Sequence, residues 1–110
     1  MRRGLALALL TIPTAAMAAA PGLAIVNAAG ADMSGLFIRR VGASEWRSLA
    51  PGLSQRATIR PSIAEHECGF DLRATFVGGG EAVWRDVNLC EVKSVTLVRR
   101  ADGVTFVDYD

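Results

Sequence analysis

The sequence predicts an all-β protein: a small antiparallel β-sandwich of about seven strands with one disulfide, after an N-terminal signal peptide. Three observations predict this class. Short runs of β-branched and aromatic residues alternate with turn residues, two cysteines flank one pair of runs, and the first residues carry an export pattern. We find no internal repeat, heptad pattern or amphipathic helix in the sequence.

The segment between the two cysteines predicts a stapled β-hairpin. Three consecutive glycines, residues 78–80, stand between two apolar runs, and glycine adopts the positive φ of a tight loop without steric cost. Counted outward from this loop, Ala74 faces Trp84 and Cys68 faces Cys90. The sequence therefore predicts that the two sulfur atoms start close enough to bond.

The same register pairs Leu72 with the charged Asp86, so we expect a bulge that shifts the pairing near the base of the hairpin. An exported protein of this size with one cysteine pair typically forms a disulfide. Closing this loop stabilises the fold by about 3.4 kcal/mol on the chain-entropy model. The alternative is a pair of free or metal-bound thiols.

Residues 1–18 have the pattern of a secretory signal peptide. Arg2 and Arg3 supply the positive start, residues 5–10 the apolar run, and residues 16–18 the small-x-small cleavage pattern. The apolar run is shorter than the roughly 20 residues that a membrane-spanning helix needs. Two adjacent arginines also occur in twin-arginine signals, and the sequence leaves the export route open.

Cleavage leaves residues 19–110, a single β domain of about 90 residues. The full chain has 12 basic and 11 acidic residues, so removing two arginines leaves ten against eleven, a net charge of −1. The mature chain has no predicted membrane span. We expect it to be periplasmic or secreted.

Other segments predict the remaining strands, namely residues 22–27, 36–41, 55–60, 92–98 and 104–109. The first two are expected to pair as a hairpin. The last two are joined by Asp102-Gly103, which is typical of a two-residue turn. Between strands, Ser44 is expected to cap a single helical turn that carries Trp46.

Two residue types are candidates for binding. Trp46 and Trp84 could stack on a sugar or a peptide. Arg39 and Arg40 could form a basic stripe for an anionic partner with the other arginines of the strands, Arg56, Arg60, Arg99 and Arg100. The structural alternatives are core tryptophans and solvated strand edges. Export and the low aromatic content disfavour nucleic acid as a partner.

The sequence predicts no catalytic residue, metal or cofactor. His66, the only histidine, lies beside Glu65, Glu67 and Cys68, but neighbours on an extended chain point in opposite directions. No second metal-ligand motif accompanies it. Catalytic carboxylates can be drawn from several acidic residues, namely Asp71, Asp86, Glu45 and Glu81, without any motif that selects a pair.

Several strings together resemble a known family: F-D-L-R, V-N-L-C-E-V-K-S-V-T-L, V-D-Y-D, the N-x-x-G near the mature start and the S-E-W-R loop. The chain is similar to small exported, uncharacterised proteins of alphaproteobacterial type, some labelled twin-arginine signal proteins and some argininosuccinate lyase. This chain is too short for such a lyase and lacks its motifs. The resemblance implies export and a conserved cysteine pair, and it implies no catalytic residue.

The leading hypothesis is a non-enzymatic binding or envelope-associated structural module whose partner is a protein, peptide or glycan. The alternative is a small periplasmic enzyme or metal-binding protein that uses His66 and nearby carboxylates. A pocket joining His66 to carboxylates of another strand would favour the alternative. A face with accessible tryptophan or arginine would favour the binding module.

Overall fold

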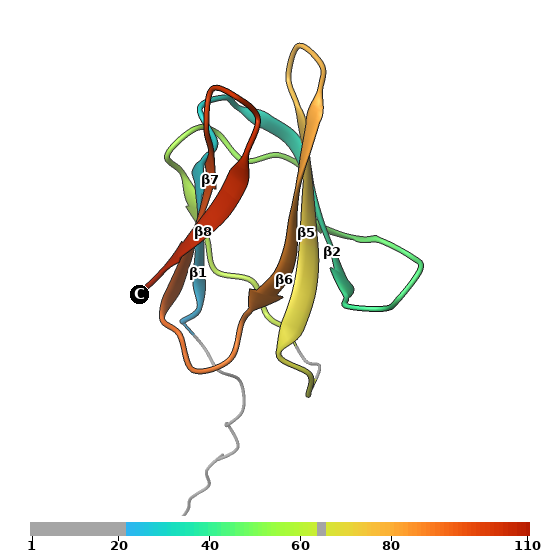
Figure 1. The fold of residues 1–110 in the computed structure, drawn as a ribbon. Helices are drawn as coiled ribbons and strands as arrows, with labels where there is room; N and C mark the ends of the chain where they lie inside the picture. The colour runs from blue at the N-terminus through green and yellow to red at the C-terminus, as the bar shows by residue number, and fades with distance from the viewer. Residues whose placement is uncertain (1–21, 64–65) are drawn as a thin grey trace, which may run out of the picture.

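The structure, a computed structural model, describes residues 22–63 and 66–110, which form a two-layer β-sandwich (Figure 1). The predicted signal peptide lies outside these residues. The strands are β1 (Ala24–Ala28), β2 (Met33–Arg40), β3 (Arg47–Ala50), β4 (Thr58–Ile59), β5 (Gly69–Phe76), β6 (Glu81–Asn88), β7 (Ser94–Arg99) and β8 (Thr105–Tyr109). The predicted fold class is confirmed, with eight strands in the described residues rather than about seven.

Each layer is a sheet of four strands. Sheet A has the order β4-β1-β7-β8, and sheet B has the order β3-β2-β5-β6. Sheet B is antiparallel throughout. In sheet A, however, β1 and β7 run parallel, with Ile25 beside Val95. The sandwich is therefore mostly rather than wholly antiparallel.

The predicted hairpin between the first two runs is wrong, because β1 and β2 lie in different sheets. Both edges of β1 are already occupied, by β4 on one side and β7 on the other. No edge of β1 remains for β2, so the chain crosses to sheet B and β2 pairs with β3 and β5.

The helical turn expected after Ser44 is also wrong, since β3 occupies most of that stretch and pairs with β2. A single helical turn fixes several residues for one hydrogen bond, whereas pairing along β2 satisfies the backbone of β3. The predicted strand over residues 55–60 shortens to β4, because Arg56 takes a positive φ of 71° before it.

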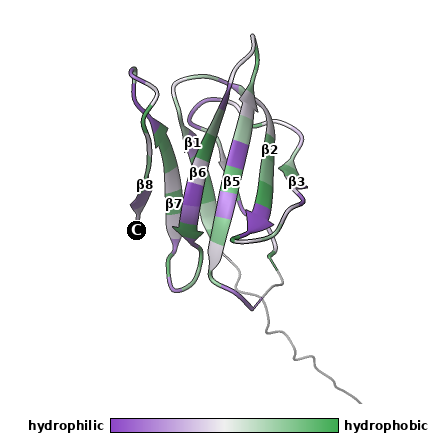
Figure 2. Cartoon of the chain, turned by 45° about the vertical axis from the view of Figure 1, so that its right-hand side comes forward, coloured by the Kyte–Doolittle hydropathy of each residue, from purple (hydrophilic) through white to green (hydrophobic). Residues whose placement is uncertain are grey.

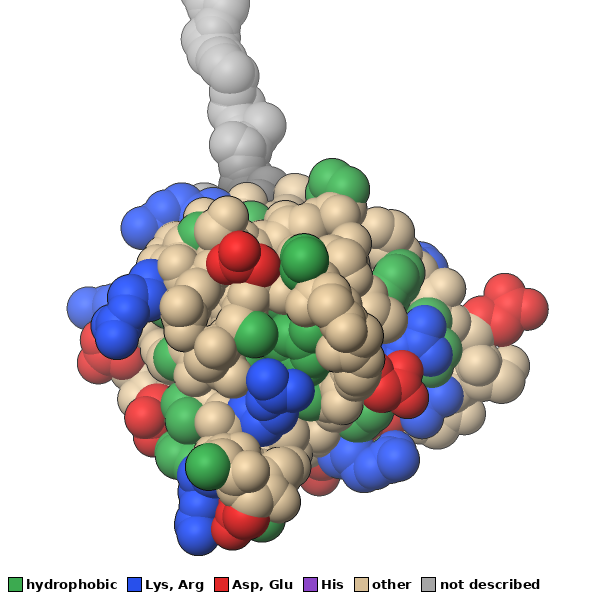
Figure 3. All heavy atoms as spheres, turned by 90° about the horizontal axis from the view of Figure 1, so that it is seen from above, with side chains coloured by type: hydrophobic (Ala, Val, Ile, Leu, Met, Phe, Trp, Pro, Cys, Tyr) green, Lys and Arg blue, Asp and Glu red, His purple; other side chains and the backbone are tan. Residues whose placement is uncertain are grey.

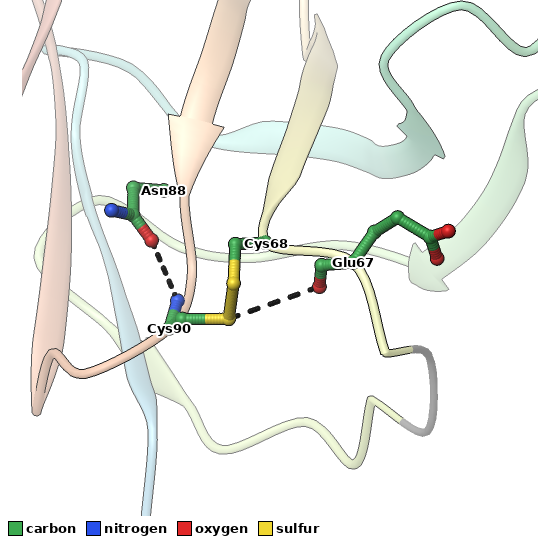
Figure 4. The surroundings of a disulfide bond; sticks show 4 residues. All are labelled: Glu67, Cys68, Asn88 and Cys90. Atoms are coloured by element: carbon green, nitrogen blue, oxygen red, sulfur yellow. Dashed lines mark hydrogen bonds between the residues drawn. A yellow bond between two sulfur atoms is a disulfide. The ribbon is translucent and has the colours of Figure 1, made fainter.

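The hairpin of β5 and β6 is confirmed, and so is the disulfide between Cys68 and Cys90, whose Cα atoms are 5.1 Å apart. Figure 4 shows how the bridge is held: the amide of Cys90 donates to Oδ1 of Asn88 at 2.8 Å, and Sγ of Cys90 lies 3.9 Å from the carbonyl oxygen of Glu67. The disulfide therefore joins the ends of both strands at the base of the hairpin.

The register of this hairpin differs from the expected one. The amide of Phe76 donates to the carbonyl of Gly80 at 3.1 Å, so the three-residue loop begins one residue earlier, at Val77. Leu72 then faces Trp84 rather than Asp86. The expected bulge near the base is present, between Phe70 and Leu72. The observed register is favoured because it places two apolar side chains opposite each other in the core.

The final hairpin, β7 with β8, is confirmed with a longer turn. The amide of Arg100 donates to the carbonyl of Val104 at 2.8 Å, which leaves three residues in the loop instead of two. Gly103 ends this loop with a φ of 91°, a conformation that glycine adopts without a Cβ clash.

The core lies between the sheets and follows the alternation of the strands, visible as hydrophobic and hydrophilic bands along β5 and β6 (Figure 2). On β5 the inward residues are Phe70, Leu72, Ala74 and Phe76. Trp84 of β6 is the bulkiest fully buried side chain, and its indole N–H donates to the carbonyl of Val98 in sheet A at 2.9 Å. This bond links the two layers.

Asn27 of β1 is the most connected polar residue of the core. Its side chain is fully buried and donates to the carbonyls of Ala31 and Leu53, both at 2.9 Å, while its Oδ1 accepts from the amide of Ala29 at 2.9 Å. Leu53 in turn exchanges backbone hydrogen bonds with Met33 of β2. The side-chain amide of Asn27 thus stabilises the segments through which the chain crosses between the sheets.

We expect Cys68→Ser and Cys90→Ser to lower the free energy of unfolding by similar amounts, about 2–5 kcal/mol for a small disulfide-bonded domain. The double variant should cost little more than either single one, because each single change already removes the bridge. Urea unfolding of the three variants measures this. A double variant that is destabilised by the sum of the two single changes would contradict it.

We expect Asn27→Ala to lower the free energy of unfolding by about 2–4 kcal/mol. The amide of Ala29 and the carbonyl of Ala31 lose their side-chain partner, and the carbonyl of Leu53 keeps only its backbone hydrogen bond. Gln55→Ala is the matched control, since it removes an exposed side-chain amide nearby. Chemical denaturation should show a large shift of the midpoint for the first variant and nearly none for the second. Equal shifts would show that the buried amide has no special role.

Candidate functional site

The outer face of sheet B carries a cluster of basic and aromatic side chains. Because inward residues alternate with outward ones, β2 presents Phe37 and Arg39 here, and β5 presents Asp71 and Arg73. The loop between β2 and β3, which projects from the sandwich in Figure 1, adds Trp46. We name these five residues the arginine–tryptophan face.

Cation–π contacts hold this face together. The guanidinium carbon of Arg39 lies 4.2 Å from the centroid of the Trp46 ring, and that of Arg73 lies 5.0 Å from it. Arg73 also lies 5.0 Å from the ring of Phe37. Contacts within about 6 Å are attractive, by about 0.5–1 kcal/mol at exposed sites. Trp46 therefore fastens its loop to the sheet through two arginines.

A glycine makes room for this packing. A Cβ added at Gly35 would lie 3.0 Å from Cε1 of Phe37 and 3.2 Å from Oγ1 of Thr75. Such distances are too short for a side chain without movement of the ring. The absence of a side chain at Gly35 thus lets Phe37 lie along β2, where Arg73 reaches it.

Asp71 is buried on this face and fully engaged. Its Oδ2 accepts from Nε of Arg39 at 3.1 Å, and its Oδ1 accepts from the backbone amide of Asp86 at 3.0 Å. Asp86 has a φ of 55° in the bulge of β6, which turns its amide toward β5. The bulge thus supplies the second hydrogen bond that a buried carboxylate requires.

Arg73 and Arg85 are the basic groups without an acidic partner on this side. Within residues 22–63 and 66–110, no ion pair reaches either guanidinium. Nε of Arg73 is also buried without a hydrogen-bond partner. Arg85 follows the inward Trp84 on β6 and is exposed. Since Arg39 already neutralises Asp71, these two charges are available to an anion.

The structure sorts the predicted binding residues into two groups. It brings Trp46 and Arg39 together, as described. Arg40 turns away from them and pairs with Glu67 at 3.5 Å, where both side chains are about half exposed. Trp84 is only 1% exposed, so its assignment as a binding residue is wrong: its position on β6 faces the core.

The residue that sequence reasoning missed is Arg73. The sequence does indicate it, because apolar and polar residues alternate in residues 70–76 and the polar ones must lie on the face of β5 that points away from the core.

The predicted basic stripe across the strands is wrong, because Arg99 lies in sheet A, 4.0 Å from the ring of Phe76. Figure 3 accordingly shows several separate groups of basic side chains around the molecule, one of them on the side of β2 and β5.

His66 is exposed and does not belong to a metal centre of the described chain. No group of three histidine, cysteine, aspartate or glutamate residues within residues 22–63 and 66–110 is placed to hold a metal ion. Cys68 is oxidised in the disulfide, so its thiolate is lost as a ligand. Glu65, which sequence reasoning placed beside His66, lies outside the described residues.

Comparison with family models, curated proteins and solved structures finds no match to this chain. The resemblance to small exported proteins therefore stays a prediction. Among the described residues, no helix could cross a membrane.

Proposed function

We propose that the protein is an exported, non-enzymatic binding module that holds an anionic partner on the arginine–tryptophan face. The observation that carries this proposal is the geometry of Arg73, which two aromatic rings hold in place and which no acidic residue of the described chain neutralises. The partner is a protein, peptide or glycan that carries carboxylate groups.

The chemistry of the guanidinium supports a carboxylate as the recognised group. Stacking on a ring engages the flat face of a guanidinium and leaves its N–H edge to form hydrogen bonds in its own plane. A carboxylate can accept two parallel hydrogen bonds from such an edge. Because Trp46 and Phe37 already restrict Arg73, the binding of an anion costs less side-chain entropy than at a free arginine.

The disulfide supports export, because such bonds form and persist in oxidising compartments. The cleavage pattern at residues 16–18 supports it from the sequence. Both lines agree with a protein that meets its partner in the periplasm or outside the cell.

For export, we expect N-terminal sequencing of the protein from the periplasm or culture medium to begin near Ala19. Cleavage after the small-x-small pattern gives this start. Ala18→Arg, which removes the small residue before the cut, is the control and should retain the leader. A wild-type exported protein that still starts at Met1 would contradict the proposal.

For binding, we expect poly-L-glutamate or polygalacturonate, as model acidic peptide and glycan, to bind the mature protein in calorimetry. Arg73→Gln should weaken the binding about tenfold, the value of one charge-assisted contact. Trp46→Ala should weaken it by about threefold and leave the fold intact, because it releases the ring that positions both arginines.

The matched control is Arg100→Gln, which removes the same charge from an exposed arginine that directly follows β7, away from sheet B. It should leave the affinity within about twofold, because exposed ion pairs contribute little. Equal weakening by Arg100→Gln and Arg73→Gln would show unspecific charge attraction. Loss of folding in Trp46→Ala, with unchanged affinity of the folded fraction, would make Trp46 a packing residue.

A further inference from the structure

A second candidate site lies at the end of the sandwich opposite the tip of the β5–β6 hairpin, where β1, β5 and β7 begin. A cavity of 710 Å³ opens there. Its apolar wall combines three buried residues, Leu23, Ala24 and Phe70, with three partly buried side chains that pack against the core, Ile63, Leu89 and Val92. The cavity is therefore lined by apolar side chains at this end of the core.

The size and polarity of the cavity match a site for a small molecule. Sites for small ligands measure about 300–1,000 Å³ and have mostly apolar walls with few polar groups. Here the charged groups are Arg60, Lys93, Glu67 and Glu91, all of which belong to connections or strand ends. A ligand with an apolar body inside the cavity and a polar end group outside it fits this arrangement.

One cation at the opening is available to a negative end group. The lining carries two basic and two acidic residues, and Glu67 is already paired with Arg40. A further acidic residue, Asp110, lies beside Lys93, whose backbone amide donates to the carbonyl of Asp110 at 2.8 Å. Nη1 of Arg60 donates to the carbonyl of Gly22 at 3.1 Å. The Lys93 ammonium has no ion-pair partner within residues 22–63 and 66–110. Lys93 is therefore the cation that can meet an anionic ligand.

We propose that this cavity binds an acyl chain that ends in a carboxylate, with the chain against Leu23, Phe70 and Val92 and the carboxylate at Lys93. Each methylene that leaves water adds to the affinity, so a medium-length chain supplies most of it. The site is separate from the arginine–tryptophan face, which lies on the outer side of sheet B, and it does not depend on that proposal.

The test is a titration of the mature, oxidised protein with decanoate, followed by NMR. We expect shifts at the methyl groups of Leu23, Leu89 and Val92. Decanol, which has the same chain without the charge, should bind about fivefold more weakly, as expected for one exposed ion pair. Lys93→Gln should remove this difference between the two ligands while retaining the binding of decanol.

Val92→Trp fills the cavity and should abolish binding. Its matched control is Val77→Trp at the exposed tip of the opposite hairpin, which should bind as the wild type does. Amide spectra of both variants establish that each is folded. Three outcomes would overturn the proposal: no shifts with decanoate, shifts centred on the exposed Phe106 instead of the cavity, or equal affinity for decanoate and decanol.

Discussion

The arrangement of the sandwich depends on how one buried amide is satisfied. Asn27 lies in β1, between β4 and β7, yet its side chain binds Leu53, the residue that continues the pairing of β2. A polar group in a core is tolerated only when it is hydrogen-bonded, and the bonds of Asn27 exist only where the chain crosses between the sheets. The Asn27 side chain therefore fills a core position and favours the crossing from β1 to sheet B over a simple hairpin of β1 with β2.

The sequence was sufficient to predict most of the strands and the disulfide, because both follow from local patterns. The alternation in β5 and β6 and the paired cysteines identify one stapled hairpin. The pairing of β1 was not predictable in this way. Its neighbours, β4 and β7, are far away in the chain, and no local pattern in residues 22–41 shows that both edges of β1 are occupied. The β5–β6 loop was misplaced by one residue and the β7–β8 loop is one residue longer than expected, since glycine allows more than one turn.

The candidate site was predicted in part for the same reason. Trp46 and Arg39 were chosen for their chemistry, and the structure brings them together. Arg73 enters only when β5 is placed beside β2, which requires the sheet order. Trp84 shows the opposite error: its chemistry suits a binding surface, but the register of β6 turns it into the core. Residue type indicates what a side chain can bind, and register decides whether a ligand can reach it.

The parallel pairing of β1 with β7 has a consequence for the order of assembly. All strands of sheet B and both cysteines lie within residues 33–90, so that sheet and its disulfide can form from a continuous part of the chain. In sheet A, β1 pairs with β4, which lies within the same part of the chain, and with β7, which follows it. As a chain is made from its N-terminus, the second edge of β1 must wait for β7 until nearly the whole protein has emerged. Until then β7 and β8 cannot cover the inner face of sheet B, and folding is completed only when these last strands pair.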